Sequence, residues 1–269
     1  MFELQAHGGD TFVGQGPKYP WGGLYGGQIV AQALRAAAET VEPEYIPHSL
    51  RAYFIRRGDH REPVRYEVDR IRNGRSFVTR RVVARQAVGA ILNLEASFQA
   101  DEPSQAVQTV TMPDVPGPEE LAEDSWLDRF VRRDVPPSSF GVGQAGAGRV
   151  LRWVKLNERL GDLGDPSSAL DHLCWTAFMS DDVPSDAVIR SHPNGGTDHH
   201  EQFFGASLDH TMWFHRPMRA DEWHLYDATC HAFNRARGLA FGHVFAADGT
   251  HTVTFAQEFL AREAAPPQP

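Results

Sequence analysis

The clearest pattern along the chain is an alternation of apolar and polar residues in two separate groups of segments. The first group covers residues 48–57, 63–74, 76–86 and 90–99. A period of two over segments of this length predicts β-strands with one face buried and the other in water. Turn-forming residues separate the segments, among them Asn73-Gly74, so we expect an antiparallel meander of long strands.

A helical period precedes this group, in residues 20–41. Its apolar positions are Ile29, Val30, Ala33, Leu34 and Ala37. This spacing predicts a helix of about four turns whose buried face carries small side chains. A helix followed by an antiparallel meander predicts an α+β unit in which the sheet wraps its apolar face around the helix.

Four glycines lead into this helix: Gly22, Gly23, Gly26 and Gly27. Such a glycine-rich segment before a helix can present backbone N–H groups to an anion or a carbonyl oxygen. It can also let the helix lie close to a sheet. The spacing is not GxGxxG after a clear strand, so we do not expect a dinucleotide site.

The same order returns in the second half of the chain. A strand at residues 149–158 leads to a helix at residues 166–181, and Ser207–Phe214 is predicted as a strand that carries one hydroxyl among aromatic residues. Three further strands are expected within residues 222–233, 236–249 and 250–261, with a hairpin turn at Asp248-Gly249. When the halves are aligned, Ser49 falls on Ser207 and Gln99 on Gln257 with the same offset, which indicates a duplicated unit.

The stretch between the halves has a different composition. It is rich in proline, ends in the run GVGQAGAG, and contains residues 119–133, whose apolar positions predict a short surface helix. We therefore expect four regions. They are a first domain at residues 1–100, a connector with a short helix at 101–148, a second domain at 149–262, and a disordered tail at 263–269.

Composition and charge narrow the class of protein. The chain has 269 residues, of which 41% are hydrophobic and 23% charged, as in a soluble globular protein. A net charge of −9 argues against a nucleic-acid partner. The cysteines Cys174 and Cys230 form no disulfide or metal motif, and we find neither an export signal nor a membrane helix. A cytoplasmic protein without membrane insertion is expected.

Several other motifs do not support a metal site or a different catalytic residue. His199-His200-Glu201 lacks the HExxH spacing and an obvious third ligand, so we expect a solvated loop and no metal. Ser207 lies in GASLD, which is not the GxSxG of a serine hydrolase. His210 and His215 are expected to be strand residues with satisfied hydrogen bonds rather than catalytic bases.

Five segments resemble a known family when they are taken together. They are LYGGQIVAQAL, HSLRAYFIRRGD, GRSFVTRRVVARQ, SLDHTMWFHRP and the closing AQEF. They resemble, in this order, the signature segments of the type II acyl-CoA thioesterases, the TesB-like family of lipid metabolism. The resemblance runs from about residue 20 to residue 262 and implies an α+β double hotdog fold. In that fold two tandem hotdog domains each wrap an antiparallel sheet around a long helix.

The resemblance also implies a catalytic set of Asp, Thr and Gln. The Asp falls on Asp181, with Asp182 as the alternative register, and the Gln falls on Gln257. The Thr position falls on Ser207, which keeps the hydroxyl but lacks the methyl group and so rotates more freely. The family mechanism implies a water activated by Asp181 and positioned by Ser207 and Gln257, without an acyl-enzyme and without a cofactor.

Substrate contacts are expected at two places. By analogy with hotdog enzymes, the backbone of Gly26, Gly27 and Gln28 is the candidate donor to the oxyanion. On charge grounds, several arginines are candidates for the phosphates of coenzyme A: Arg56, Arg57 and Arg75, with Arg80 and Arg81. The first half offers Glu39, Ser49 and Gln99, but the acid is spaced differently from Asp181, so we expect one working site per chain.

Two functions from different classes remain open at this point. The first is hydrolysis of acyl-CoA to free acid and coenzyme A. The second is a non-catalytic acyl-CoA binding or sensing protein of the same fold, for which the Ser207 substitution is the only support. A homodimer or a larger homo-oligomer is expected because the fold leaves a broad sheet surface.

Overall fold

The first half forms a helix and a sheet, as predicted. The computed structural model describes residues 1–140, 148–195 and 202–264. The elements of the first half are β1 (Gln5–Ala6), β2 (Thr11–Gly14), α1 (Gly26–Ala38), β3 (Tyr45–Phe54), β4 (Val64–Asn73), β5 (Phe77–Gln86) and β6 (Gly89–Ala100). The sequence predicted the helix and the four long strands, and it did not predict the short strands β1 and β2.

The second half repeats this order with additions. Its elements are the 3₁₀ turns η1 (Pro118–Glu120) and η2 (Pro137–Ser139), the helices α2 (Pro166–Ser180) and α3 (Asp182–Ser191), and the strands β7 (Phe130–Asp134), β8 (Arg149–Leu156), β9 (Phe203–Ser207), β10 (Asp209–Phe214), β11 (His224–Asn234), β12 (Arg237–Ala246) and β13 (His251–Glu263). The predicted turn at Asp248-Gly249 is present, with Gly249 at a φ of 87°. The helix α3 was not predicted, and the strand expected from Ser207 is broken at Leu208 into β9 and β10.

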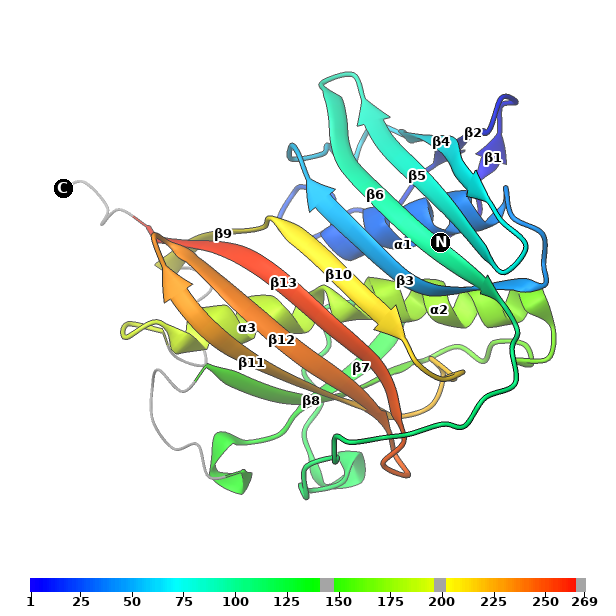
Figure 1. Ribbon diagram of the computed structural model, residues 1–269. Helices are drawn as coiled ribbons and strands as arrows, with labels where there is room; N and C mark the ends of the chain where they lie inside the picture. The colour runs from blue at the N-terminus through cyan, green and yellow to red at the C-terminus, as the bar shows by residue number, and fades with distance from the viewer. Residues whose placement is uncertain (141–147, 196–201, 265–269) are drawn as a thin grey trace.

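The strands of the described residues form one 13-stranded sheet that runs through both halves. The two halves meet where β3 pairs antiparallel with β10, with Arg51 opposite Thr211. The helices α1 and α2 lie side by side against one face of this sheet (Figure 1). They run in opposite directions, since Arg35 near the end of α1 pairs with Asp171 near the start of α2. Each half is therefore a helix packed on an antiparallel sheet, as the sequence predicted.

The local sequence explains why the helices begin where they do and how they pack. The side chain of Asp165 accepts a hydrogen bond from the backbone N–H of Ser168 and caps α2, and Pro166 occupies the first turn. In α1 the side chains of Val30, Ala33 and Leu34 are fully buried. Small residues on the buried face let α1 approach both α2 and the sheet closely.

The short surface helix predicted in residues 119–133 is wrong. This stretch contains η1 and the strand β7, which pairs with β8 so that Arg132 lies opposite Val154. A short isolated helix is marginally stable, whereas an edge strand gains backbone hydrogen bonds along β8. Strand β7 also lies inside the expected connector, so the second sheet begins before residue 149.

Three expectations concern residues outside the described ranges. They are the end of the connector at residues 141–147, the loop with His199-His200-Glu201, and most of the tail at residues 265–269. The first residue of the expected tail, Glu263, is the last residue of β13. Within the described ranges, none of the helices combines the length and the apolar character needed to cross a membrane.

Arg80 has a structural role that excludes it as a contact for phosphate. Its side chain is 2% exposed. It donates hydrogen bonds to the hydroxyl and the carbonyl oxygen of Thr40, at 2.7 and 2.9 Å, and to the carbonyl oxygen of Arg72 at 3.0 Å. Arg80 thus ties the end of α1 to the β4–β5 hairpin. The neighbouring Arg81 is exposed and donates to Asn93 on the next strand.

We predict that Arg80→Leu lowers the free energy of unfolding by about 2–4 kcal/mol, because it removes the buried hydrogen bonds to the carbonyl oxygens of Thr40, Arg72 and Thr79. The matched substitution Arg81→Leu changes it by no more than about 0.5 kcal/mol, as expected for an exposed side chain. Urea unfolding followed by circular dichroism measures both values. Equal effects of the two substitutions would contradict the assigned role of Arg80.

Candidate active site

Asp181 lies at a break between two helices. It ends α2 and precedes α3, with φ and ψ of −75° and −15°. Pro184 explains the break, because in a continuous helix its ring would clash with the carbonyl group of Ser180, four residues earlier. The Asp181 carboxylate is 5% exposed and lies between the helices and the sheet. The proline was visible in the sequence and is the signal that could have predicted α3.

The three residues expected to be catalytic lie in hydrogen-bond contact. The hydroxyl of Ser207 donates to Oδ1 of Asp181 at 3.0 Å. The side-chain amide of Gln257 donates to the Ser207 hydroxyl at 2.9 Å. Ser207 is the last residue of β9, next to the strand break, and Gln257 is a fully buried residue of β13. Two strands and a helix end therefore bring the three residues together.

The start of α1 reaches this cluster from the first half of the chain. The backbone N–H of Gly27 donates to the Asp181 carboxylate. A β-carbon added at Gly26 would lie 2.6 Å from Oδ2 of Asp181, so only glycine fits at this contact. The positive end of the α1 dipole thus faces a carboxylate of the second half. Of the expected oxyanion residues, Gly26 and Gly27 lie at the site.

Burial changes the acidity of Asp181. It raises the pKa of this carboxyl to about 6, against the lowering effect of the hydrogen bonds from Ser207, Gly27 and Gln257. The carboxylate is therefore ionised at neutral pH, yet it holds a proton far more readily than an exposed aspartate does. These are the properties of a general base that operates near neutral pH.

Asp182, the alternative candidate for the catalytic aspartate, has a different environment. Its carboxylate accepts hydrogen bonds from Arg152 at 2.8 Å, from Arg132 at 3.0 Å and from the indole of Trp126 at 2.8 Å. Arg152 is 2% exposed and also pairs with Asp186 at 2.6 Å. Asp182 is thus held in a buried ion network beside the site, and Asp181 is the residue that meets Ser207.

Some of the residues expected to contact the substrate lie near Asp181, and others lie away from it. The side chain of Gln28 turns into the first half, where it accepts a hydrogen bond from Tyr19 at 2.7 Å. Arg56 and Arg57 follow the end of β3 at Phe54, whose ring lies 3.0 Å from the β-carbon position at Gly26. Arg57 donates to the carbonyl oxygen of Trp21 at 3.0 Å, near the start of α1.

Arg75 lies at the opposite end of β3. Its backbone carbonyl accepts a hydrogen bond from Tyr45, the first residue of β3. The rise of about 3.3 Å per residue in a strand places Tyr45 roughly 30 Å from Phe54. Arg75 is therefore not brought to the Asp181 site.

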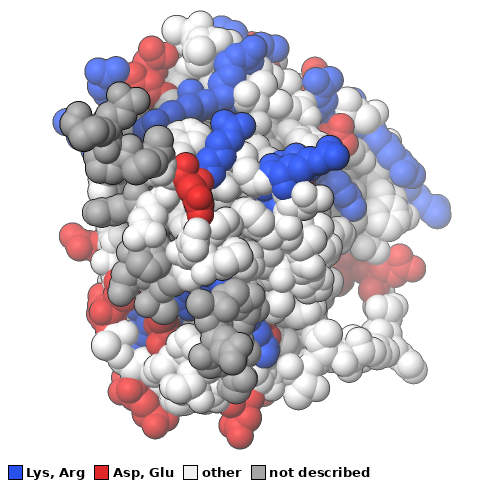
Figure 2. All heavy atoms as spheres, turned by 90° about the vertical axis from the view of Figure 1, so that its left-hand side faces the viewer, with Lys and Arg blue, Asp and Glu red and all other residues white. Residues whose placement is uncertain are grey.

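Seen from the left-hand side of Figure 1, Lys and Arg side chains gather over the upper part of the molecule, where the first half lies (Figure 2).

The first half does not present Ser49 and Gln99 in the way the second half presents Ser207 and Gln257. Ser207 lies opposite the buried Phe259. Ser49 is also buried, but it lies opposite Ser97 on the face of β3 that carries the exposed Arg51, not on the core face of Leu50. Gln257 lies opposite the buried Ala240. Gln99 lies opposite Ile46, which is 53% exposed. The sequence alignment of the halves therefore pairs residues that point to opposite faces.

An aromatic cluster beside Asp181 was missed by the sequence reasoning. Tyr25 donates a hydrogen bond to the carbonyl oxygen of Phe178 at 2.9 Å, and its ring packs edge-on against Phe178 and Trp126. Trp21 stacks on Tyr19 with ring centroids 5.1 Å apart. Tyr25 and Trp126 thus pack against Phe178, three residues before Asp181. Tyr19, Trp21 and Tyr25 lie within seven residues of sequence, which was the available signal.

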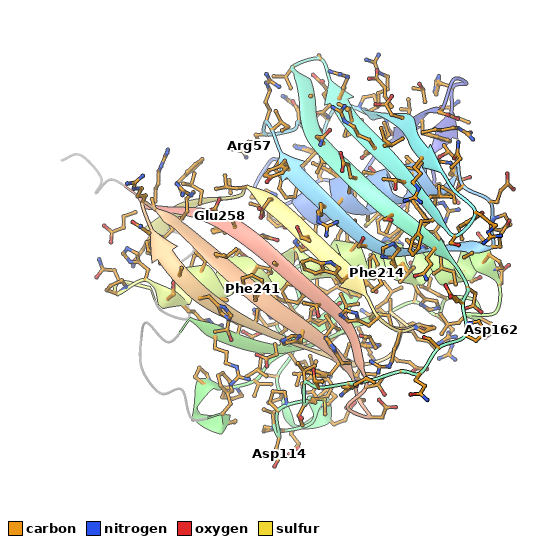
Figure 3. All side chains as sticks on the ribbon, in the orientation of Figure 1. Arg57, Asp114, Asp162, Phe214, Phe241 and Glu258 are labelled. Carbon is orange, nitrogen blue, oxygen red and sulfur yellow. The ribbon has the colours of Figure 1, made fainter. Side chains whose placement is uncertain are left out.

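One cavity lies away from this site, toward the other end of α1 and α2. It has a volume of about 790 Å³ and is lined by residues from the end of α1, the start of α2 and the end of β10, among them Arg35, Leu170 and Phe214. Figure 3 shows Arg57 and Phe214 at opposite ends of the β3–β10 junction.

Among residues 1–140, 148–195 and 202–264, no group of three or more His, Cys, Asp or Glu side chains is placed to hold a metal ion.

Comparison with known proteins gives consistent matches over nearly the whole chain. The family model described as "Acyl-CoA thioesterase N-terminal domain" matches residues 16–99, and "Acyl-CoA thioesterase C-terminal domain" matches residues 105–261. Acyl-coenzyme A thioesterase 8 of Homo sapiens is 36% identical over 278 residues, which cover 94% of this chain and 85% of that protein. Acyl-CoA thioesterase 2 of Haemophilus influenzae is 32% identical over 253 residues, covering 89% and 87%.

Solved structures match as well. The acyl-CoA thioesterase II TesB2 from Mycobacterium marinum superposes with a TM-score of 0.83 at 34% identity, covering 100% of this chain and 98% of that one. A protein from Alicyclobacillus acidocaldarius described as having a hot dog fold superposes with a TM-score of 0.77 at 20% identity, covering 98% and 97%, which supports the fold alone.

These matches define first a class, that of thioester hydrolases with a double hotdog fold, and they confirm the predicted fold. Both family models match in chain order, and the curated relatives exceed 30% identity over most of the chain. The chain therefore belongs to the type II acyl-CoA thioesterase family, as its sequence motifs predicted.

We predict that Gly26→Ala lowers thioesterase turnover by about 10- to 100-fold, since the new β-carbon displaces the Asp181 carboxylate. Gly164→Ala is the matched control, because a β-carbon at Gly164 meets nothing within 4 Å. Steady-state hydrolysis by the two variants, with circular dichroism to check folding, measures the difference. Full activity of a folded Gly26→Ala protein would show that Asp181 does not need its present position.

Proposed function

We propose that this chain hydrolyses acyl-CoA thioesters to a free acid and coenzyme A, with Asp181 as the general base. The observation that carries the proposal is the continuous hydrogen-bond chain from Gln257 through Ser207 to a buried Asp181. Such a chain fixes a hydroxyl and an amide next to a carboxylate whose pKa suits proton transfer near neutral pH.

The proposed reaction uses one water and no covalent intermediate. Asp181 removes a proton from the water as its oxygen attacks the thioester carbonyl carbon. Ser207 already accepts one hydrogen bond and donates another, and its second lone pair can orient the water. The tetrahedral intermediate then collapses, the C–S bond breaks, and the proton held by Asp181 passes to the thiolate of coenzyme A.

The developing oxyanion requires donors, which we assign to the first turn of α1. The N–H groups of a first helical turn have no intrahelical acceptor. The N–H of Gly27 is engaged with Asp181, so the backbone N–H groups of Gly26 and Gln28 on either side are the proposed donors. Arg56 and Arg57, at the same end of β3, are the proposed contacts for the phosphates of coenzyme A.

The discriminating experiment incubates the purified protein with short, medium and long acyl-CoAs and follows the release of free thiol. We expect hydrolysis, and a loss of about 100-fold or more in kcat for Asp181→Asn with Asp182 intact. Asp171→Asn, on the same helix and 41% exposed, is the control and should retain activity.

Two results would contradict the proposal. A well-folded protein that hydrolyses none of the acyl-CoAs would favour the non-catalytic binding or sensing function. Retained activity in Asp181→Asn would exclude Asp181 as the base. The cytoplasmic location and the homo-oligomeric state stay predictions, and light scattering at micromolar concentration would test the second.

The raised pKa of Asp181 gives the reaction a defined pH dependence. Only the ionised carboxylate can accept the proton, so kcat/KM should reach half its maximum near pH 6, where the pKa of Asp181 lies. Below that pH it should fall about tenfold per unit, and above it should level off. A pH–rate profile between pH 4.5 and pH 8 measures this curve. A flat profile, or a rate that rises toward acid, would contradict the assignment.

A further inference from the structure

His210 extends the hydrogen-bond chain beyond the three residues of the proposed mechanism. It lies on β10 with its side chain fully buried. Its Nδ1 is 2.6 Å from Oε1 of Gln257, and its Nε2 is 2.8 Å from the hydroxyl of Ser180. Both ring nitrogens are thus engaged, one with a proposed catalytic residue and the other with the residue before Asp181.

The direction of each hydrogen bond follows from the chemistry of the groups. The amide nitrogen of Gln257 donates to Ser207, so its oxygen, which faces His210, can only accept. Nδ1 of His210 must therefore carry the proton. A neutral imidazole has one N–H, so Nε2 accepts from the hydroxyl of Ser180. The chain runs from Ser180 through His210, Gln257 and Ser207 to Asp181, and its two ends are adjacent residues.

We propose that His210 is a positioning residue, which holds the Gln257 amide in the one orientation that directs the Ser207 proton to Asp181. This inference rests on the proposed function, because Gln257 and Ser207 matter only if they orient the attacking water. His210 itself touches neither water nor substrate, and it acts through the amide.

The alternative orientation of the amide shows what the Nδ1–H tautomer of His210 excludes. If the Gln257 side chain were flipped, its oxygen would face Ser207, and the serine hydroxyl would donate to it instead of to Asp181. The flipped amide nitrogen would then face Nδ1 of His210, and the ring could accept from it only as the Nε2–H tautomer, which donates to Ser180 while the Ser180 hydroxyl donates to the carbonyl oxygen of Ala177. The Nδ1–H tautomer therefore goes with the amide orientation that leaves the Ser207 proton for Asp181. Burial lowers the pKa of His210 to about 4, so the ring stays neutral over the range in which Asp181 ionises.

Two substitutions of His210 separate its two hydrogen bonds. The amide of Asn lies close to the position of Nδ1, and the amide of Gln reaches the position of Nε2. His210→Asn can therefore still donate to Gln257, whereas His210→Gln keeps only the contact with Ser180. We expect His210→Gln to lower kcat by about 10- to 100-fold with KM within about twofold, and His210→Asn to restore most of kcat. His215→Gln, at the end of the same strand, is the control and should leave kcat unchanged.

A double-mutant cycle with Gln257→Ala tests whether His210 acts through the amide. Once Gln257 is removed, His210→Gln should cause no further loss of kcat, so the two effects should not add. Additive losses, or equal kcat values for the folded Asn and Gln variants, would overturn the inference while leaving the proposed function in place. An inactive wild-type protein would show instead that the proposed function has failed, and a fully active Gln257→Ala variant would remove the positioning role of Gln257 and with it the inference about His210.

A measurement on the unsubstituted protein avoids the risk that a variant fails to fold. Long-range ¹H–¹⁵N correlation spectra of the histidine rings distinguish the two neutral tautomers. We expect His210 in the Nδ1–H form at pH 7, with Nε2 unprotonated. The Nε2–H form, or a charged ring at that pH, would overturn the inference.

Discussion

The pairing of β3 with β10 is the contact on which the candidate site depends. It joins two sheets into one and places α1 and α2 side by side in opposite directions. The start of α1 therefore meets the end of α2, where Asp181 lies, and the N–H of Gly27 reaches its carboxylate. The second half carries the three side chains, and the first half supplies the helix start that they face. Neither half holds the whole arrangement.

The two adjacent carboxylates at the helix break lie in contrasting surroundings, and only the proposed base, Asp181, has no cationic partner. Asp182 is held by the guanidinium groups of Arg132 and Arg152, and its charge is balanced there. Asp181 accepts its hydrogen bonds from neutral donors, Ser207 and Gly27. Burial without a cationic partner keeps the proton affinity of Asp181 high. The ion network thus also fixes α3, so the position of the break is well defined.

The sequence predicted what depends on local periodicity and missed what depends on tertiary contacts. Helices α1 and α2 and the long strands follow from periods of 3.6 and 2 within single segments. The strand β7 exists because β8 lies beside it, and the break at Leu208 lies where the pairing with β13 shifts by one residue between β9 and β10. Ser207 is 26 residues from Asp181 and 50 from Gln257, and no spacing rule connects such positions. The family resemblance, and not periodicity, indicated them.

Ser49 and Ser207 lie on opposite faces of the sheet, and this limits which mutations could give the first half a site of its own. The irregularity in β3 falls before Ser49, between Pro47 and that serine, while the break in the second half falls after Ser207. Moving such an irregularity by one position turns the following side chains to the other face of the sheet. A point substitution at Ser49 therefore cannot recreate the site in the first half, which also lacks an acid spaced like Asp181. The two halves thus differ in strand register as well as in side chains, so the asymmetry of the site is built into the backbone.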